Sequence, residues 1–305
     1  MIRLTAATRG GALAIAQIKS VITMLKKVHP DINIETKIIT TTGDSDRRTA
    51  LWNLKDTGFF TSQIEDALLK NQADFAVHSF KDLPTQQREG LKITAVCDRL
   101  FVEDCLLSDL QVDTIEQLPH GAKIGTSSLR RVAQLKHLRG DLQIEPVRGN
   151  VKTRIKKLEA GEYDAIILAR AGLERLGLEK KISFVFEPVE FIPAPAQGAL
   201  AIQTRTDDKE TNEIVAAIND KHAQIETSAE RKILTVLQCG CHAPVGAYAK
   251  ISEEKMKIRA FISDIDGKKL ITKKMEGPVS NAESIAENLA KELLSDGGNE
   301  ILNNI

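Results

Sequence analysis

Alternation between short apolar runs and longer amphipathic segments is the feature of this chain that most restricts its fold. In the first third, such segments follow one another over residues 2–6, 12–28 and 34–39. The order is strand, helix, strand, which is typical of parallel strands joined by helical crossovers. A second series between residues 101 and 192 repeats the layout, with strands expected near residues 123–125, 143–147 and 164–169. The sequence therefore predicts an α/β protein with two similar units.

The last third departs from this layout. Prolines and a glycine interrupt residues 192–198, and the apolar run that follows predicts a strand that returns to the first unit. Helical spacing over residues 223–237 and 282–294, with strands around the Asp266-Gly267 turn, predicts a small α+β domain. A chain of 305 residues is long enough for two or three domains. The predicted domains are residues 1–97 with 197–216, residues 98–196, and residues 217–305.

The composition argues against nucleic acid and membranes as partners. The chain has 42 Lys and Arg against 42 Asp and Glu, and only 4% aromatic residues. It therefore lacks both a global electrostatic field and a stacking surface for single strands. No apolar run approaches the roughly 18 residues that cross a bilayer, the first residues show no signal-peptide pattern, and four cysteines make no disulfide framework. We expect a cytoplasmic protein with reduced thiols.

Positive charge is concentrated in the middle of the chain, where residues 120–181 hold 14 Lys and Arg but 7 Asp and Glu. Residues 126–131 and 148–154 each follow a predicted strand and open a helix, a position at which backbone N–H groups and the helix dipole favour anions. For either turn alone, a Ser or Thr cap beside solvated arginines is an equal alternative. Two turns, with Arg9 after the first strand, predict a ligand with several carboxylates or phosphates.

A further group of polar residues follows the strand expected at residues 75–78. In open α/β sheets, ligands bind at the carboxyl ends of strands. Lys81 and Asp82 taken singly fit an exposed ion pair of little energetic value. A carboxylate beside bound anions and arginines can instead stabilise a developing cation or move protons, which makes Asp82 the candidate catalytic residue. His78 is expected to pack beneath the strand end.

The cysteines divide into buried and reactive candidates. Cys97 and Cys105 lie in apolar runs and are expected to be buried. Glycine precedes Cys241, which favours an exposed, reactive thiol. Cys239, Cys241 and His242 do not complete the four ligands of a zinc centre, so no metal is expected. Thiol redox chemistry lacks its usual CxxC helix start. Cys241 is therefore the candidate attachment point.

Together and in order, these motifs resemble those of the porphobilinogen deaminases, also called hydroxymethylbilane synthases. The similar segments, which span nearly the whole chain, are residues 7–9, 77–82, 125–131, 148–154, 163–169, 171–177, 197–199 and 240–241. The resemblance implies two lobes similar to type II periplasmic binding proteins, with the active site between them. It also implies a small third domain that carries the cofactor cysteine, and a monomer.

The resemblance further implies a transferase of tetrapyrrole (haem) biosynthesis. Such an enzyme condenses four porphobilinogen molecules head to tail, with release of ammonia, into 1-hydroxymethylbilane. Porphobilinogen and the growing polypyrrole are its ligands, and a dipyrromethane cofactor, bound here through a thioether to Cys241, is the primer. The residues implied to bind the cofactor are Ser79, Lys81, Asp82, Thr126, Ser128, Arg130 and Arg131. Those implied to bind substrate carboxylates, which would be costly to bury unpaired, are Arg9, Arg148, Arg154 and Arg175.

Three positions depart from the usual pattern of that family. Gly11 stands where serine is common, Thr57 where lysine is usual, and Ala196 where glycine is common. The first two remove polar contacts and leave Asp82 and Cys241 in place, so the expected reaction is unchanged. A polar stretch over residues 40–58 is expected to form a mobile lid before a short helix with a capping box formed by Ser62 and Glu65.

The alternative is a non-catalytic protein that binds small anions between two lobes. It would account for the arginine-bearing turns. It would not account for Cys241 or for the third domain.

Overall fold

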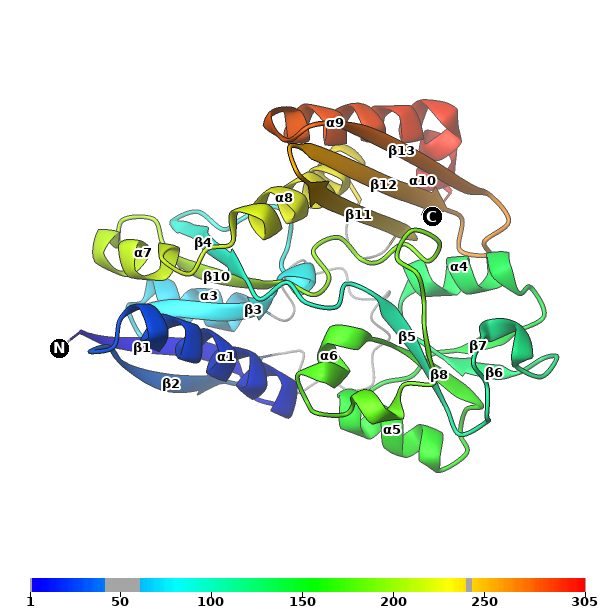
Figure 1. Cartoon of the computed structure of the whole chain (residues 1–305), viewed down its shortest axis with the longest axis horizontal. Coiled ribbons are helices and arrows are strands. Elements are labelled where there is room, and N and C mark those ends of the chain that lie inside the picture. Colours follow the sequence, from blue (N-terminus) through cyan, green and yellow to red (C-terminus); the bar gives the residue numbers. More distant parts are fainter. Residues whose placement is uncertain (1, 42–60, 240–242, 305) are drawn as a thin grey trace. The chain divides into compact units, whose positions relative to one another are not determined.

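A computed structural model describes residues 2–41, 61–239 and 243–304. Within these residues the chain forms three sheets with helices packed on them (Figure 1). The described residues divide into two compact units. The first contains residues 2–41, 61–100 and 198–224, and the second contains residues 101–197, 225–239 and 243–304. The predicted α/β class is confirmed, whereas the three predicted domain boundaries stay a prediction.

The first unit is built on a sheet in the order β2-β1-β3-β10-β4. Its strands are β1 (Arg3–Arg9), β2 (Asn33–Ile39), β3 (Phe75–Ser79), β4 (Leu91–Cys97) and β10 (Leu200–Arg205), and its helices include α1 (Ala12–Val28), α3 (Ser62–Leu69) and α7 (Lys209–Ala216). β1 is parallel to β2 and β3, while β10 is antiparallel to both of its neighbours. The returning strand predicted after residue 198 is therefore confirmed as β10.

The helices of the first unit cover both faces of the sheet. α1 buries Ile18, Val21 and Leu25, whose spacing of three and four residues places them on one helical face. They pack with apolar residues of β1, β3 and α7 in one core. The opposite face carries a second core, in which Ile64 and Leu68 of α3 pack on the sheet. Burial on both faces explains why the first three residues of β3, Phe75 to Val77, are all apolar.

The second unit contains a sheet with the same pattern, in the order β7-β6-β8-β5-β9. Its strands are β5 (Asp104–Ser108), β6 (Lys123–Gly125), β7 (Gln143–Glu145), β8 (Ala165–Ala169) and β9 (Phe184–Val185), and its helices are α4 (Leu129–Leu138), α5 (Val151–Glu159) and α6 (Arg170–Glu174). β6 is parallel to β7 and β8, and β5 is antiparallel to β8. α4 covers one face, and α5 and α6 cover the other.

The same aspartate motif joins the strands of both sheets. The carboxylate of Asp74, just before β3, accepts a hydrogen bond from the Thr5 N–H at 2.6 Å, and the Asp74 N–H donates to the Thr5 carbonyl. Asp164, just before β8, makes the same pair of bonds with Lys123, at 2.7 Å for the carboxylate. Each aspartate therefore fixes the start of one parallel strand against its neighbour, which sets where the carboxyl ends of the strands lie.

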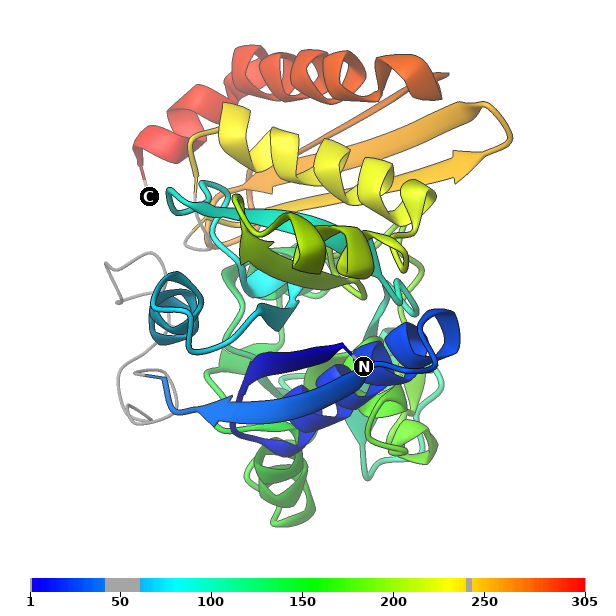
Figure 2. The same cartoon turned by 90° about the vertical axis from the view of Figure 1, so that its left-hand side faces the viewer.

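The rest of the second unit is an antiparallel sheet of β11 (Val245–Ser252), β12 (Lys255–Ser263) and β13 (Leu270–Pro278). α8 (Lys221–Val236), which begins in the first unit, and α9 (Ala282–Leu293) run along it and share one apolar core with it, and α10 (Asn299–Asn303) follows (Figure 2). The turn between β12 and β13 contacts α4, because Lys136 Nζ lies 2.6 Å from Asp266 Oδ1 and His137 Nδ1 lies 3.0 Å from the Gly267 carbonyl. The predicted helices and turn of this region are confirmed.

The N-terminus of α3 differs from the predicted capping box. The helix is present, but its N-cap is Thr61, and the Glu65 carboxylate accepts a hydrogen bond from Gln203 at 3.0 Å. The predicted capping box is therefore wrong, because a buried cross-sheet partner takes the glutamate. Residues 42–58 of the predicted lid, Thr57 among them, lie outside the described residues. None of the helices in the described ranges is long and apolar enough to cross a membrane.

The contact between α4 and the β12–β13 turn predicts a strong requirement for glycine. Gly267 has φ 68°, and a Cβ there would lie 2.3 Å from the Ala133 carbonyl oxygen. We expect Gly267→Ala to lower the free energy of unfolding by about 2 to 4 kcal/mol, from left-handed strain and the clash together. Urea unfolding followed by circular dichroism measures the loss.

Gly161→Ala is the matched control for this substitution. Gly161 has a similar φ of 73°, but a Cβ there would meet no atom within 4 Å among the described residues. It should cost about 1 kcal/mol through strain alone. Equal losses in the two variants would show that the turn does not pack on α4 as described.

Candidate functional site

The first unit gathers one group of predicted site residues at one edge of its sheet. Arg9 ends β1 and Ser79 ends β3, while Lys81 and Asp82 lie in the single helical turn that follows β3. Since β1 and β3 are parallel neighbours, their carboxyl ends meet at the same edge. Asp82 is exposed and Lys81 is half-buried. The structure therefore brings these four residues to a single sheet edge.

Local hydrogen bonds fix the turn that carries Asp82. The Phe80 N–H donates to the Ala199 carbonyl at 3.0 Å, which ties the turn to the chain entering β10. Buried Gln17 of α1 donates through Nε2 to Ser79 Oγ at 2.7 Å. A hydroxyl that accepts one hydrogen bond can still donate its own proton. Ser79 is thus oriented as a donor, which suits a carboxylate ligand.

His78 contributes no charge to this edge. Its side chain is 6% exposed, and burial lowers its pKa to about 4, with the charge of Arg9 acting in the same direction and Gln203 opposing it. Nε2 has no hydrogen-bond partner in the described part of the chain. The imidazole is therefore neutral near pH 7, and its predicted packing beneath the strand end is confirmed.

The second unit gathers the other predicted residues at the equivalent edge of its sheet. Those after β6 are Thr126, Ser128, Arg130 and Arg131, those after β7 are Arg148 and Arg154, and Arg175 follows α6. β6 is parallel to both β7 and β8, so the three connections start from neighbouring strand ends. The turn after β7 requires glycine, because Gly149 has φ 111° and a Cβ there would lie 2.7 Å from the Thr153 side chain. Arg154 Nε donates to the Gly149 carbonyl at 2.7 Å.

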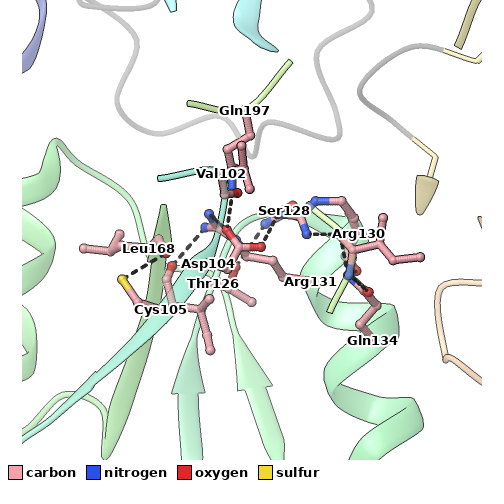
Figure 3. Close-up of polar contacts among 12 residues, drawn as sticks. Val102, Asp104, Cys105, Thr126, Ser128, Arg130, Arg131, Gln134, Leu168 and Gln197 are labelled. Carbon is pink, nitrogen blue, oxygen red and sulfur yellow. Dashed lines mark hydrogen bonds and ion pairs between the residues drawn. The ribbon is translucent and has the colours of Figure 1, made fainter. Parts of the chain in front are cut away.

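Arg130 and Arg131 belong to a buried ion cluster centred on Asp104 (Figure 3). Asp104, the first residue of β5, is fully buried. Its Oδ2 lies 2.6 Å from Nη2 of Arg130, and its Oδ1 lies 2.7 Å from Nη2 and 3.1 Å from Nε of Arg131. The remaining guanidinium nitrogens reach carbonyls, since Nη1 of Arg130 donates to Ile192 and Nη1 of Arg131 donates to Ile167. Both arginines are about as buried as core residues.

The cluster carries an excess of positive charge. Two guanidinium groups face one carboxylate, and the arginine side chains are only 5% and 7% exposed. Burial lowers the pKa of Arg130, and the charge of Asp104 opposes that effect. Nε of Arg130 is buried without a hydrogen-bond partner among the residues described. A surplus cation with an unused donor fits a further anionic oxygen, because buried charges are stable only when paired.

Sequence reasoning missed Asp104 as a member of the site. The available signal was a carboxylate at the first position of the apolar run of residues 105–107. A charge that opens a fully buried strand needs a cationic partner. Gln197 belongs to the similar segment of residues 197–199, but its role as a donor to Asp104 Oδ1, at 3.0 Å from Nε2, was not predicted.

The two buried cysteines are poor nucleophiles. Cys97 and Cys105 are 1% and 0% exposed, which confirms the predicted burial. Burial raises the pKa of Cys105 to about 12, with Asp104 adding to the effect, and its thiol donates to the Leu168 carbonyl. Cys239 is half-buried. Cys241, the predicted attachment point, lies outside the described residues. Within the described residues, no group of three or more Asp, Glu, Cys or His side chains could hold a metal ion.

Comparisons with known proteins cover almost the entire chain. Residues 4–213 match the family model "Porphobilinogen deaminase, dipyromethane cofactor binding domain", and residues 224–295 match "Porphobilinogen deaminase, C-terminal domain". A porphobilinogen deaminase of Maridesulfovibrio salexigens is 41% identical over 305 residues, which cover 100% of this chain and 99% of the relative. One of Carboxydothermus hydrogenoformans is 41% identical over 298 residues, with 98% and 96% covered.

Solved structures with a similar arrangement include two binding proteins. The methionine binding protein MetQ has a TM-score of 0.46 at 11% identity, with 71% of this chain and 89% of that chain covered. A TRAP periplasmic solute binding protein from Desulfovibrio salexigens has a TM-score of 0.43 at 12% identity, with 73% and 74% covered.

The buried cluster predicts that Asp104 is far more important to stability than a surface carboxylate. In Asp104→Asn two buried guanidinium groups lose their counter-charge, so we expect the free energy of unfolding to fall by about 3 to 5 kcal/mol. Asp66→Asn is the control, since Asp66 pairs with Arg88 at 2.5 Å while both side chains are over 40% exposed. It should cost less than about 1 kcal/mol. Similar losses in urea unfolding would contradict the description of the cluster.

Proposed function

The chain belongs to the porphobilinogen deaminase family, and from this premise we propose which of its residues carry the reaction. The protein is a transferase of tetrapyrrole biosynthesis that condenses four porphobilinogen molecules head to tail, with release of ammonia, into 1-hydroxymethylbilane. Its cofactor is dipyrromethane, which supplies the pyrrole carbon that receives the first substrate. A non-catalytic anion-binding protein is not favoured, because both family domains match.

We assign attachment of the cofactor to Cys241. Cys97 and Cys105 are less suitable, since both are buried and the pKa of Cys105 is about 12. A thiolate is the nucleophilic form of cysteine, so a thiol that does not ionise near neutral pH is a poor site for thioether formation. Cys241 follows α8 in the chain, between Gly240 and His242.

The observation that supports a cofactor site most strongly is the surplus charge of the Asp104–Arg130–Arg131 cluster. One further carboxylate would balance the two guanidinium groups, and dipyrromethane carries acetate and propionate side chains. The buried, unused Nε of Arg130 is a donor suited to such an oxygen. Thr126 and Ser128 lie at the start of the same helix, where N–H groups and hydroxyls favour anions. We propose that Arg130 and Arg131, together with Thr126 and Ser128, bind carboxylates of the cofactor.

We propose that Asp82 is the catalytic residue. Its exposed carboxylate lies on a hydrogen-bonded turn, beside Lys81 and at the same sheet edge as Arg9 and Ser79. A fixed carboxylate stabilises the positive charge that develops on the pyrrole as ammonia leaves, and it can move the proton that the ring loses afterwards. Lys81 and Ser79 supply donors for cofactor carboxylates at this edge.

The remaining arginines are proposed to neutralise the growing product. Each porphobilinogen adds one acetate and one propionate, so four rounds add eight carboxylates. Arg9, Arg148, Arg154 and Arg175 lie on connections at the carboxyl ends of strands in their respective units. Arginine binds carboxylates in a bidentate manner and stays charged at any physiological pH.

We also propose three domains, a monomeric state and a cytoplasmic location. Three sheets, each with its own apolar core, support three domains with the boundaries expected from the sequence. A monomer in the cytoplasm, with no nucleic acid or membrane as partner, is consistent with a small soluble substrate and with the balanced charge of the chain.

The assignments of Cys241 and Asp82 are tested by intact mass and turnover. We expect the purified protein to carry an adduct of dipyrromethane size that reacts with Ehrlich's reagent. Cys241→Ser should lack the adduct, while Cys239→Ser, two residues away, should retain it. Asp82→Asn should retain the adduct but lose about 10²-fold or more in turnover, the usual contribution of general acid–base catalysis.

Two outcomes would contradict these assignments. An adduct that persists in Cys241→Ser would place attachment at another residue. Wild-type turnover in Asp82→Asn would remove the carboxylate from the reaction. A wild-type chain that stays unmodified after incubation with porphobilinogen would count against the function itself.

A further inference from the structure

The segment of residues 192–197, here called the connector, joins the two arginines to the C-terminal sheet within the second unit. On one side, the Ile192 carbonyl accepts hydrogen bonds from Nη1 of Arg130 at 2.7 Å and from Nε2 of Gln134 at 3.1 Å. On the other side, the Pro193 carbonyl accepts from the Ala247 N–H of β11 at 3.1 Å. The connector is therefore a direct mechanical link between α4 and β11.

Glu230 of α8 holds the connector through a fully buried carboxylate. One oxygen accepts a hydrogen bond from the Ala196 N–H and the other from the Ala249 N–H of β11, each at 2.7 Å. A carboxylate shared between two backbone donors fixes both segments at once, because hydrogen bonds to a charged acceptor are short and strong. Glu230 thus sets the position of the connector relative to β11.

The residue that Glu230 holds is in a conformation that needs support. Ala196 has φ 63°, in the left-handed region, where a Cβ is unfavourable. Such a conformation persists only where the surroundings determine it, and it is often found next to functional groups. This also explains why glycine suits this position, at which the chain has alanine.

The next residue carries the effect to the arginine cluster. Gln197 Nε2 donates both of its hydrogens, to the Val102 carbonyl at 2.8 Å and to Asp104 Oδ1 at 3.0 Å (Figure 3). Asp104 in turn orients Arg130 and Arg131. Rotation of the Ala196 peptide would move Gln197 away from Asp104 and loosen the arrangement of donors.

We propose that Glu230 is a positioning residue for the cofactor site. It acts through Ala196 and Gln197 on Asp104, and so fixes the two arginines in the geometry that receives a cofactor carboxylate. This inference rests on the proposed role of Arg130 and Arg131.

Glu226 provides a matched control on the same helix. It lies one turn before Glu230, is 4% exposed, and accepts a hydrogen bond from the Ile251 N–H of β11 at 2.8 Å. Both glutamates therefore stabilise the same strand from the same helix. The bond to the connector belongs to Glu230. Glu226 also lies 3.7 Å from Lys250 Nζ. A purely structural role of Glu230 would lower the stability of its variant and leave the loading rate of the folded protein unchanged.

The test compares Glu230→Gln with Glu226→Gln in the full chain, purified from cells that cannot make porphobilinogen. A glutamine amide presents an NH₂ group to one of the two N–H donors, so one bond is lost. On addition of porphobilinogen, the rate at which the chain gains its covalent adduct is followed by intact mass. We expect this rate to fall about tenfold in Glu230→Gln, as for one lost charge-assisted bond, and to stay within about twofold of wild type in Glu226→Gln.

The pathway is tested by Gln197→Ala and by the double variant. Gln197→Ala should slow loading to a similar degree, and Glu230→Gln with Gln197→Ala should be no slower than the slower single variant, because coupled residues are not additive. Independent, multiplied losses would overturn the proposed route through Gln197. Equal loading rates in the two glutamate variants would overturn the role of Glu230.

Three further results separate this inference from the proposed function. If Glu230→Gln fails to fold while Glu226→Gln folds, Glu230 is required for the fold itself and the positioning role is overturned. If wild type gains no adduct, the proposed function fails. If wild type loads normally and Glu230→Gln loads equally fast, only the inference fails.

Discussion

The carboxylate of Asp104 is the interaction on which the described site of the second unit depends. One fully buried group accepts hydrogen bonds from Arg130, Arg131 and Gln197, and so connects β5, α4 and the connector. Without it, two guanidinium groups in the interior would face each other without a counter-charge. With it, the cluster keeps one unbalanced positive charge. The same three side chains therefore stabilise the fold and keep a positive charge that the described contacts do not balance.

The two α/β sheets share one arrangement of parallel and antiparallel strands. In each, the strand in the second position is parallel to both of its neighbours, and the strand in the fourth position is antiparallel to the third. Asp74 and Asp164 anchor equivalent strands by equivalent hydrogen bonds. This arrangement places several strand ends side by side at one edge, which is where an α/β sheet can present loops to a ligand.

The C-terminal sheet is joined to the second α/β sheet by polar contacts at defined points. Gly267 lets a turn approach α4, and Glu230 holds a strained alanine beside Gln197. In each contact a side chain of one element binds a backbone group of another. These contacts connect the part of the chain that precedes Cys241 with the helix that carries Arg130 and Arg131.

The sequence by itself determined the local elements and the candidate chemistry. Hydrophobic periodicity predicted the strands and helices of both α/β series, and the motifs predicted Asp82, Cys241 and the arginine-bearing turns, because periodicity and turn residues are local properties. Tertiary structure alone decided which of these groups meet. Asp104, Gln197 and Glu230 are far in sequence from the groups that they bind. Glu65 accepts a hydrogen bond from Gln203 and does not form the predicted capping box. These pairs depend on burial, because a buried carboxylate is stable only when donors from the surrounding elements bind it.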